Sequence, residues 1–285
     1  DRLILATSDI AAEPKIALWV AMNVAEGPSR VIRGPHLNAI TLLAFDDNKG
    51  KTLVSLGADD RHTVAVHDVT SGYLLFVSST TCRKPFDVAF GNFGSEIAIV
   101  GIKYILFFTF LANHAATRHA SASFGRIGRL GTIQSYLSCA YLPNASCVVG
   151  TADGHLFVFE GSSRELGKSI KAHDGFIYSM DAPWHRTEQI SAIVLVTGAR
   201  DGDVKLWNGA LEIISKFDNR GAGPIRSVFT SADSSRILVG SQAASQLREF
   251  RASDGVPTSV ALAGGGAAAG ELWGLAPHPL EKYVA

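Results

Sequence analysis

Residues 196–208 read VTGARDGDVKLWN. Two apolar runs flank the charged turn RDGD, and both contain the β-branched and aromatic residues that favour strands, so the segment is typical of a tight β-hairpin. Asp201 stands six residues before Trp207. If this arrangement recurs along the chain, the chain is built from repeated hairpins, and the period of the repeat identifies the architecture.

Apolar runs of roughly four to eight residues do recur from one end of the chain to the other. They are rich in Val, Ile, Phe and Tyr, and Gly, Asp, Asn and Ser separate them. No stretch carries apolar residues at helical spacing over several turns. We therefore expect many short antiparallel strands and minimal helix.

An aromatic residue or a histidine ends every second hairpin strand, at intervals of roughly 40–50 residues, and this period with four strands per unit indicates the blades of a β-propeller. These residues are Trp19, His67, Phe108, Phe159, Trp207 and Phe250. The first strands of the units are expected at Ile40–Phe45, Phe86–Phe90, Tyr136–Tyr141, Ile177–Met180, Ile225–Phe229 and Leu272–Ala276.

The sequence thus predicts an all-β WD-repeat propeller of four-stranded antiparallel blades, with about six blades and incomplete blades at both ends. We expect one domain over residues 1–285, divided into repeats 1–33, 34–80, 81–124, 132–170, 171–218, 222–262 and the partial repeat 271–285. Because the chain begins without Met and inside a strand pattern, we expect a fragment of a longer protein. The N-terminal strands are expected to recruit strand 271–276 and so to close the ring.

The charged turn of the hairpin has a structural explanation in such a blade. An Asp in the turn accepts hydrogen bonds from a His that precedes the first strand, and this His also reaches a hydroxyl that contacts the aromatic residue of the third strand. His173, Asp201 and Trp207 match these positions. The usual hydroxyl position is Ala199, so we expect Thr197 to substitute for it. Buried polar groups are tolerated when all of them are hydrogen-bonded in this way.

Other units carry parts of the same pattern. Unit 134–160 has Thr151, Asp153 and Phe159, without a preceding His. Unit 34–69 has His36, followed by Asp59 or Asp60, and then His67 and Asp68 where Trp-Asp would stand.

Several segments resemble one family, the echinoderm microtubule-associated protein-like proteins. They are GPIRSV (223–228), ELWGLAPHP (271–279), KAHDGFIYSM (171–180), FDVAF (86–90) and ILFFTFLAN (105–113). The resemblance covers essentially the whole chain. It implies a cytoplasmic protein of the microtubule cytoskeleton whose propeller engages tubulin or microtubules without catalysis.

A long polar connection at 113–131 holds basic residues and no acidic ones. Arg118, His119, Arg126 and Arg129 are candidates for contact with an acidic partner such as the tails of tubulin. The alternative is a solvated loop without a binding role. Its GRIGRLG stretch is not followed by a helical pattern, so the phosphate-binding helix terminus of a dinucleotide site is not expected.

Composition excludes several other classes of function. The chain has 26 Lys plus Arg and 26 Asp plus Glu, so overall charge favours neither nucleic acid nor a membrane surface as a partner. Its longest apolar run is far shorter than the roughly 20 residues of a membrane-spanning helix. Three cysteines do not make a disulfide framework. We expect Cys139 and Cys147 to face one another in reduced form across a hairpin.

We expect no cofactor, no metal site and no enzymatic activity. No His or Cys spacing resembles a zinc site, and no strand-to-helix elbow presents a nucleophile. Two alternatives stay open: a general WD-repeat scaffold, for example in a ciliary or flagellar complex, and an enzyme that uses the propeller channel. The second needs several carboxylates or histidines that converge on the channel. His173 is the candidate general base, with Asp201 as the residue that orients it. Phe176 and Trp273 are candidates for a binding face.

Overall fold

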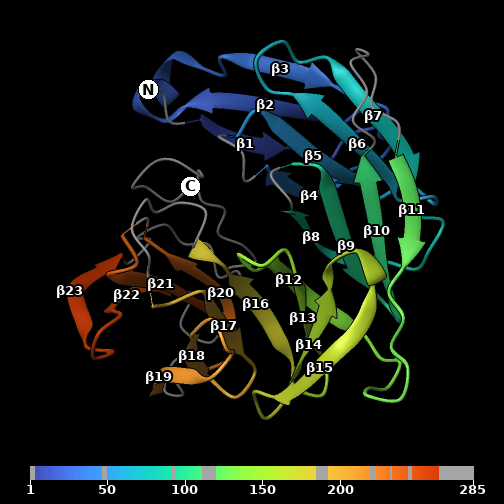
Figure 1. The fold of residues 1–285 in the computed structure, drawn as a ribbon. Helices are drawn as coiled ribbons and strands as arrows, with labels where there is room; N and C mark the ends of the chain where they lie inside the picture. Colours follow the sequence, from blue (N-terminus) through green and yellow to red (C-terminus); the bar gives the residue numbers. More distant parts are fainter. Residues whose placement is uncertain are drawn as a thin grey trace.

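The computed structural model describes residues 4–46, 50–91, 94–110, 120–183, 192–218, 223–231, 233–242 and 246–262. Six antiparallel sheets follow one another along the chain and lie around a common axis (Figure 1). The predicted all-β propeller is therefore confirmed. Among the described residues, helix is limited to two short 3₁₀ segments, Ala21–Glu26 and Gly161–Ser163.

The six sheets are numbered here in chain order. Sheet 1 has three strands, β1 (Ile4–Ser8), β2 (Lys15–Val20) and β3 (Arg30–Arg33). Sheet 2 has β4 (Ile40–Phe45), β5 (Thr52–Gly57), β6 (Thr63–Asp68) and β7 (Leu74–Ser79). Sheet 3 has β8 (Pro85–Gly91), β9 (Glu96–Gly101), β10 (Tyr104–Phe110) and β11 (Ala120–Phe124).

The second half of the chain repeats this arrangement. Sheet 4 has β12 (Tyr136–Tyr141), β13 (Cys147–Thr151), β14 (His155–Glu160) and β15 (Glu165–Lys171). Sheet 5 has β16 (Ile177–Asp181), β17 (Leu195–Ala199), β18 (Asp203–Trp207) and β19 (Ile213–Asp218). Sheet 6 has β20 (Ile225–Thr230), β21 (Arg236–Ser241), β22 (Gln246–Arg251) and β23 (Pro257–Leu262).

Five of the six expected first strands are present as β4, β8, β12, β16 and β20, and they are the innermost strands of their sheets (Figure 1). The sixth, at 272–276, lies outside the described residues, as does the partial repeat 271–285. The proposed closure of the ring by strand exchange therefore stays a prediction. No described helix has the length and apolar character needed to cross a membrane.

Each pair of neighbouring sheets encloses its own hydrophobic cluster. Between sheets 2 and 3, for example, Val54 and Val66 pack with Phe90, Ile97 and Phe108, all of them buried. Corresponding clusters lie between sheets 1 and 2, 3 and 4, 4 and 5, and 5 and 6. Because each face of an inner sheet meets a neighbouring sheet, its strands read as nearly continuous apolar runs rather than as alternating ones.

Side chains of the innermost strands connect neighbouring sheets through backbone groups. The Asp87 carboxylate accepts a hydrogen bond from the backbone N–H of Cys139 at 2.9 Å. The Ser138 hydroxyl donates to the Ile177 carbonyl at 3.0 Å, and the Ser179 hydroxyl accepts from the N–H of Val228 at 3.1 Å. These bonds link sheets 3 to 4, 4 to 5 and 5 to 6. They satisfy backbone groups that no strand ladder pairs on that side.

The innermost strand of every four-stranded sheet contains a β-bulge at the same place. In sheet 5, Ile177 pairs with Ala199 and Ser179 pairs with Gly198, so Tyr178 is the extra residue. The equivalent extra residues in the other sheets are Thr41, Phe86, Leu137 and Arg226. We call these five positions the bulge ring. A bulge redirects a side chain away from the regular alternation of the strand.

We expect Gly198→Ala to destabilise the fold. A Cβ at Gly198 on β17 would clash with the side chains of Ile225 and Val228 on the next sheet. Overpacking of this kind costs about 1–3 kcal/mol, which thermal or urea denaturation measures. Gly209→Ala is the matched control, because a Cβ there meets nothing within 4 Å. Equal stability of the two variants would contradict this account of the interface between sheets 5 and 6.

Candidate functional site

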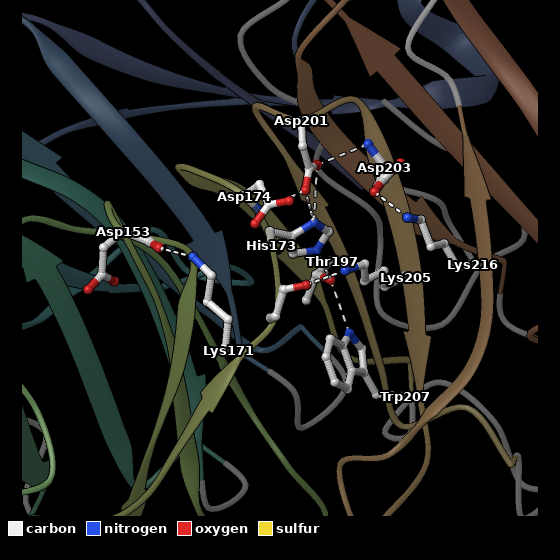
Figure 2. A network of polar contacts seen from close by, with 11 residues as sticks. Asp153, Lys171, His173, Asp174, Thr197, Asp201, Asp203, Lys205, Trp207 and Lys216 are labelled. Atoms are coloured by element: carbon white, nitrogen blue, oxygen red, sulfur yellow. Dashed lines mark hydrogen bonds and ion pairs between the residues drawn. The ribbon is translucent and has the colours of Figure 1, made fainter.

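A buried polar network joins the loop before β16 to β17, to the β17–β18 turn and to β18 of sheet 5 (Figure 2). Nδ1 of His173, in the loop before β16, lies 3.0 Å from Oδ2 of Asp201 in the β17–β18 turn. Nε2 of the same ring lies 2.8 Å from Oγ1 of Thr197, which also accepts a hydrogen bond from Nε1 of Trp207 at 3.0 Å. A neutral His173 with its proton on Nδ1 satisfies every bond. The structure thus brings together the four residues expected from the sequence, with Thr197 supplying the hydroxyl.

Electrostatics keep Asp201 ionised in this network. Burial raises the pKa of its carboxyl, but hydrogen bonds from His173 and from the backbone N–H groups of Asp174 and Asp203 outweigh this effect. The net result is a pKa well below the usual value of an aspartate. The carboxylate therefore acts as a permanent acceptor that fixes the His173 ring and the turn.

The network is closed to a substrate. The His173 side chain is fully buried, and Thr197 and Trp207 are buried as well. A general base must come within hydrogen-bond reach of the group it deprotonates, and neither nitrogen of His173 is accessible for that. The His–Asp pair therefore holds the blade together and is not a candidate base.

The predicted residues of sheet 4 do not all lie together; these are Thr151, Asp153 and Phe159. Oγ1 of Thr151 lies 2.6 Å from Oδ1 of Asp153, and Nδ1 of His155 lies 3.0 Å from the same oxygen. Burial raises the pKa of Asp153, but hydrogen bonds from Thr151 and neighbouring side chains lower it to about 2. Phe159 does not join them. It pairs with Cys147 at the opposite end of β13 and packs against Phe107 of sheet 3, with ring centroids 6.1 Å apart.

Sheet 2 contains part of the same network, with a histidine in place of the tryptophan. Nε2 of His36 lies 2.7 Å from Oγ of Ser55, and His67 occupies the place that Trp207 has in sheet 5. Asp59, rather than Asp60, is the turn acceptor and bonds the N–H and hydroxyl of Thr63. Ser55 was not among the residues expected from the sequence. Its spacing could have identified it, because Ser55 stands four residues before Asp59, as Thr197 does before Asp201.

Both histidines of sheet 2 are buried in neutral form. Burial and the neighbouring His67 lower the pKa of His36 to about 4, against a smaller raising effect of Asp59. Burial also lowers the pKa of His67. Proton uptake by either ring therefore opposes folding.

Exposed or half-buried side chains around the axis form the candidate binding surface. Phe176, just before β16, is 36% exposed, and its ring meets that of Tyr178 edge-on at a centroid distance of 5.7 Å. The Arg200 guanidinium lies 5.4 Å from the Phe176 ring, and the Arg226 guanidinium lies 4.0 Å from the Tyr178 ring. We call Phe176, Tyr178, Arg200 and Arg226 the rim cluster.

The rim cluster crosses from sheet 5 to sheet 6 and includes two members of the bulge ring, Tyr178 and Arg226. Elsewhere in the ring, the Lys84 ammonium lies 5.9 Å from the Phe86 ring. Alternating cations and aromatic faces suit carboxylate and aromatic groups of a partner protein. Phe176, a candidate from the sequence, thus lies on this surface, whereas Trp273 lies outside the described residues.

The predicted basic contact residues have different surroundings. Arg118 and His119 lie outside the described residues. Arg126 forms an ion pair with Glu165 at 2.9 Å and a hydrogen bond to the Ser163 carbonyl at 3.1 Å, so its side chain connects sheet 3 to sheet 4. Arg129 is exposed and makes no ion pair with any described residue.

The described residues include potential metal ligands and three cysteines. No group of three or more His, Cys, Asp or Glu side chains in that part of the chain is arranged to hold a metal ion. All three cysteines are free thiols. The expectation that Cys139 and Cys147 face one another was wrong, because Cys139 pairs with Val149 and Cys147 pairs with Tyr141. The two cysteines lie on the same face of the hairpin, two residue pairs apart along the ladder.

Comparison with known proteins finds a WD repeat in one part of the chain. Residues 164–208 match the family model of the WD domain, G-beta repeat. Over its whole length the chain is 23% identical to echinoderm microtubule-associated protein-like 4 of Xenopus laevis and 22% identical to the protein of that name in Xenopus tropicalis. The chain spans 31% of the length of each of these relatives.

The fold is similar to a solved propeller. The β-propeller domain of Cps50 (Swd1) from Myceliophteria thermophila superimposes with a TM-score of 0.75 at 15% sequence identity, over 96% of this chain and 87% of that one. This likeness shows the fold alone. The family resemblance expected from GPIRSV and ELWGLAPHP is thus confirmed as a distant, full-length similarity.

We expect Thr197→Val to destabilise the protein by about 1–3 kcal/mol, because it leaves buried nitrogens of His173 and Trp207 without a partner. Thr197→Ser keeps the hydroxyl and is the control. Chemical denaturation of both variants gives the difference. If the valine and serine variants were equally stable, the network would contribute nothing to folding.

The stability of the protein is expected to fall as the pH drops from 7 towards 4. Unfolded histidines bind protons near pH 6.5, whereas the pKa of folded His36 is about 4 and that of His67 is also lowered, so acid favours the unfolded chain. The loss between pH 7 and pH 5 is about 1–2 kcal/mol for one such histidine. His67→Phe should reduce this loss, measured by urea denaturation at both pH values. An unchanged pH dependence in the variant would refute the assignment.

Proposed function

We propose that this chain is a non-enzymatic protein-binding propeller of a microtubule-associated protein and that tubulin or the microtubule is its partner. Support for the partner comes from the similarity of the whole chain to part of echinoderm microtubule-associated protein-like 4, which is named as a microtubule-associated protein. The proposal places the protein in the cytoplasm on the microtubule cytoskeleton. It treats residues 1–285 as consecutive repeats of one propeller domain.

The rim cluster is the observation that carries the binding function. Two guanidinium groups and two aromatic rings lie in a continuous series across sheets 5 and 6. Arg200 is exposed and makes no ion pair in the part of the chain that the structure describes. A cation held on a rigid scaffold beside an aromatic face complements a carboxylate-rich surface, and the tails of tubulin are of that kind.

The burial of the His173 network disfavours catalysis. The candidate general base His173 and its partner Asp201 are enclosed in the blade. A general WD-repeat assembly scaffold is the second candidate, since a propeller surface can bind many classes of protein. The two candidates differ in whether microtubules are bound.

Co-sedimentation with polymerised microtubules tests the proposal. We expect the wild-type protein to sediment with microtubules at low salt and to be released as the salt concentration rises, because exposed charges are screened. Arg200→Glu should weaken binding about three- to tenfold, since it replaces an attraction by a repulsion.

Arg33→Glu is the matched control, because Arg33 is also exposed but lies on the outermost strand of sheet 1. It should bind as the wild type does. Absence of co-sedimentation at low salt would overturn the tubulin proposal and leave the general scaffold. Equal binding by the two charge-reversal variants would remove the rim cluster from the contact.

A further inference from the structure

A groove of about 380 Å³ lies between sheets 3 and 4, away from the rim cluster. This volume is within the range of roughly 300–1,000 Å³ that ligand sites usually span. Its walls are mainly aromatic and aliphatic, and they are formed by Tyr104, Ile105, Phe124, Ile127, Ile133 and Tyr136. They come from β10, from the end of β11, and from the segment that leads into β12.

The glycine-rich segment GRIGRLG (125–131) forms one side of this groove, and packing accounts for Gly125 and Gly131. Gly128 has open space around it and a φ of 59°. A Cβ at Gly131 would lie 2.6 Å from Cζ of Phe157, and a Cβ at Gly125 would lie 3.0 Å from Cε1 of Phe159. Only a backbone without side chains can lie this close to sheet 4. The phosphate-loop alternative for these glycines is thereby replaced by a structural one.

Large apolar side chains in and beside this segment are exposed. Phe124 is 57% exposed, Leu130 is 56% exposed and Ile133 is 69% exposed. Phe124 and Ile133 line the groove, and Leu130 adds an exposed apolar side chain beside it. A cluster of this kind on a soluble domain marks an interaction site.

The segment is fixed in place rather than free to collapse over the groove. The backbone N–H of Arg126 donates to the Arg164 carbonyl, and the N–H of Leu166 donates to the Arg126 carbonyl, both at 2.8 Å. The Arg126–Glu165 ion pair adds a side-chain link to the same strand. The groove is therefore largely preformed, which reduces the entropy lost on binding.

The charged side chains at the groove that make no ion pair with a described residue are basic. Lys103 lines the groove, and exposed Arg129 lies in the segment between Gly128 and Gly131. Neither makes an ion pair with a described residue, and no acidic residue is among the described residues that line the groove. Arg126, by contrast, is neutralised by Glu165.

We propose that this groove docks an extended acidic peptide segment that inserts a large apolar side chain between Phe124 and Ile133 and places its carboxylates beside Lys103 and Arg129. Charge complementarity selects an acidic occupant, and the apolar surface that continues past the groove requires one longer than a small molecule. The proposal rests on the proposed protein-binding function and adds to it a second contact site, distinct from the rim cluster.

Fluorescence anisotropy tests the groove directly. The probe is a labelled synthetic hexapeptide with two central phenylalanines flanked on each side by two glutamates. We expect saturable binding to the wild-type chain. Phe124→Ala and Ile133→Ala should each weaken it about five- to tenfold, and Arg129→Glu should weaken it and reduce its salt dependence.

Tyr73→Ala is the matched control, because Tyr73 is 75% exposed and lies in the connection between β6 and β7, outside the groove. It should bind the probe as the wild type does, and a probe with glycines in place of the phenylalanines should not bind. Thermal melting checks that each variant is folded. No saturable binding by the wild type, or equal binding by the folded groove variants and the control, would overturn the proposal.

Peptide binding in the groove and binding to microtubules can be distinguished by experiment. Peptide binding without microtubule co-sedimentation supports the groove and refutes tubulin as partner. Co-sedimentation without peptide binding supports tubulin and refutes the groove. Arg200→Glu should leave peptide binding unchanged, because the rim cluster does not line the groove.

Discussion

The contact between innermost strands of neighbouring sheets is the constraint on which this molecule depends. Among the described residues no strand ladder crosses from one sheet to the next, so the sheets are held together by apolar clusters between them and by polar side chains that reach across. Asp87, Ser138 and Ser179 each bond a backbone group of the following sheet. Hydrophobic packing supplies most of the stabilisation, while these directional bonds fix the register of one sheet against another.

The matched WD repeat shows how the sequence repeat and the sheet are staggered. Residues 164–208 span β15 to β18, so one sequence unit contributes the outermost strand of sheet 4 and the three inner strands of sheet 5. Each such unit is therefore shared between two sheets. The His173 network lies within this unit and ties the loop after β15 to β17 and β18. Local polar bonds and long-range packing thus stabilise the same junction.

Strand positions could be read from the sequence because burial on both faces leaves apolar runs such as the one in EIAIVG, which becomes β9. The spacing of Asp201 and Trp207 located the polar network for a similar reason, since the turn and the third strand have fixed lengths. The spacing of Thr197 before Asp201 could likewise have located Ser55 before Asp59. The inter-sheet bond of Asp87 could not be foreseen, because it depends on which residues of two separate segments lie opposite one another. The ion pair of Arg126 joins β-sheets whose relative placement no local pattern encodes.

The bulge ring has a consequence for how this fold diversifies. Each extra residue is left out of strand pairing, and Thr, Phe, Leu, Tyr and Arg occupy the five equivalent places. Side chains there are not required by the ladder, so evolution can exchange them with little loss of folding free energy. A propeller of this kind can change what it recognises one blade at a time, while the framework that carries those residues stays as it is.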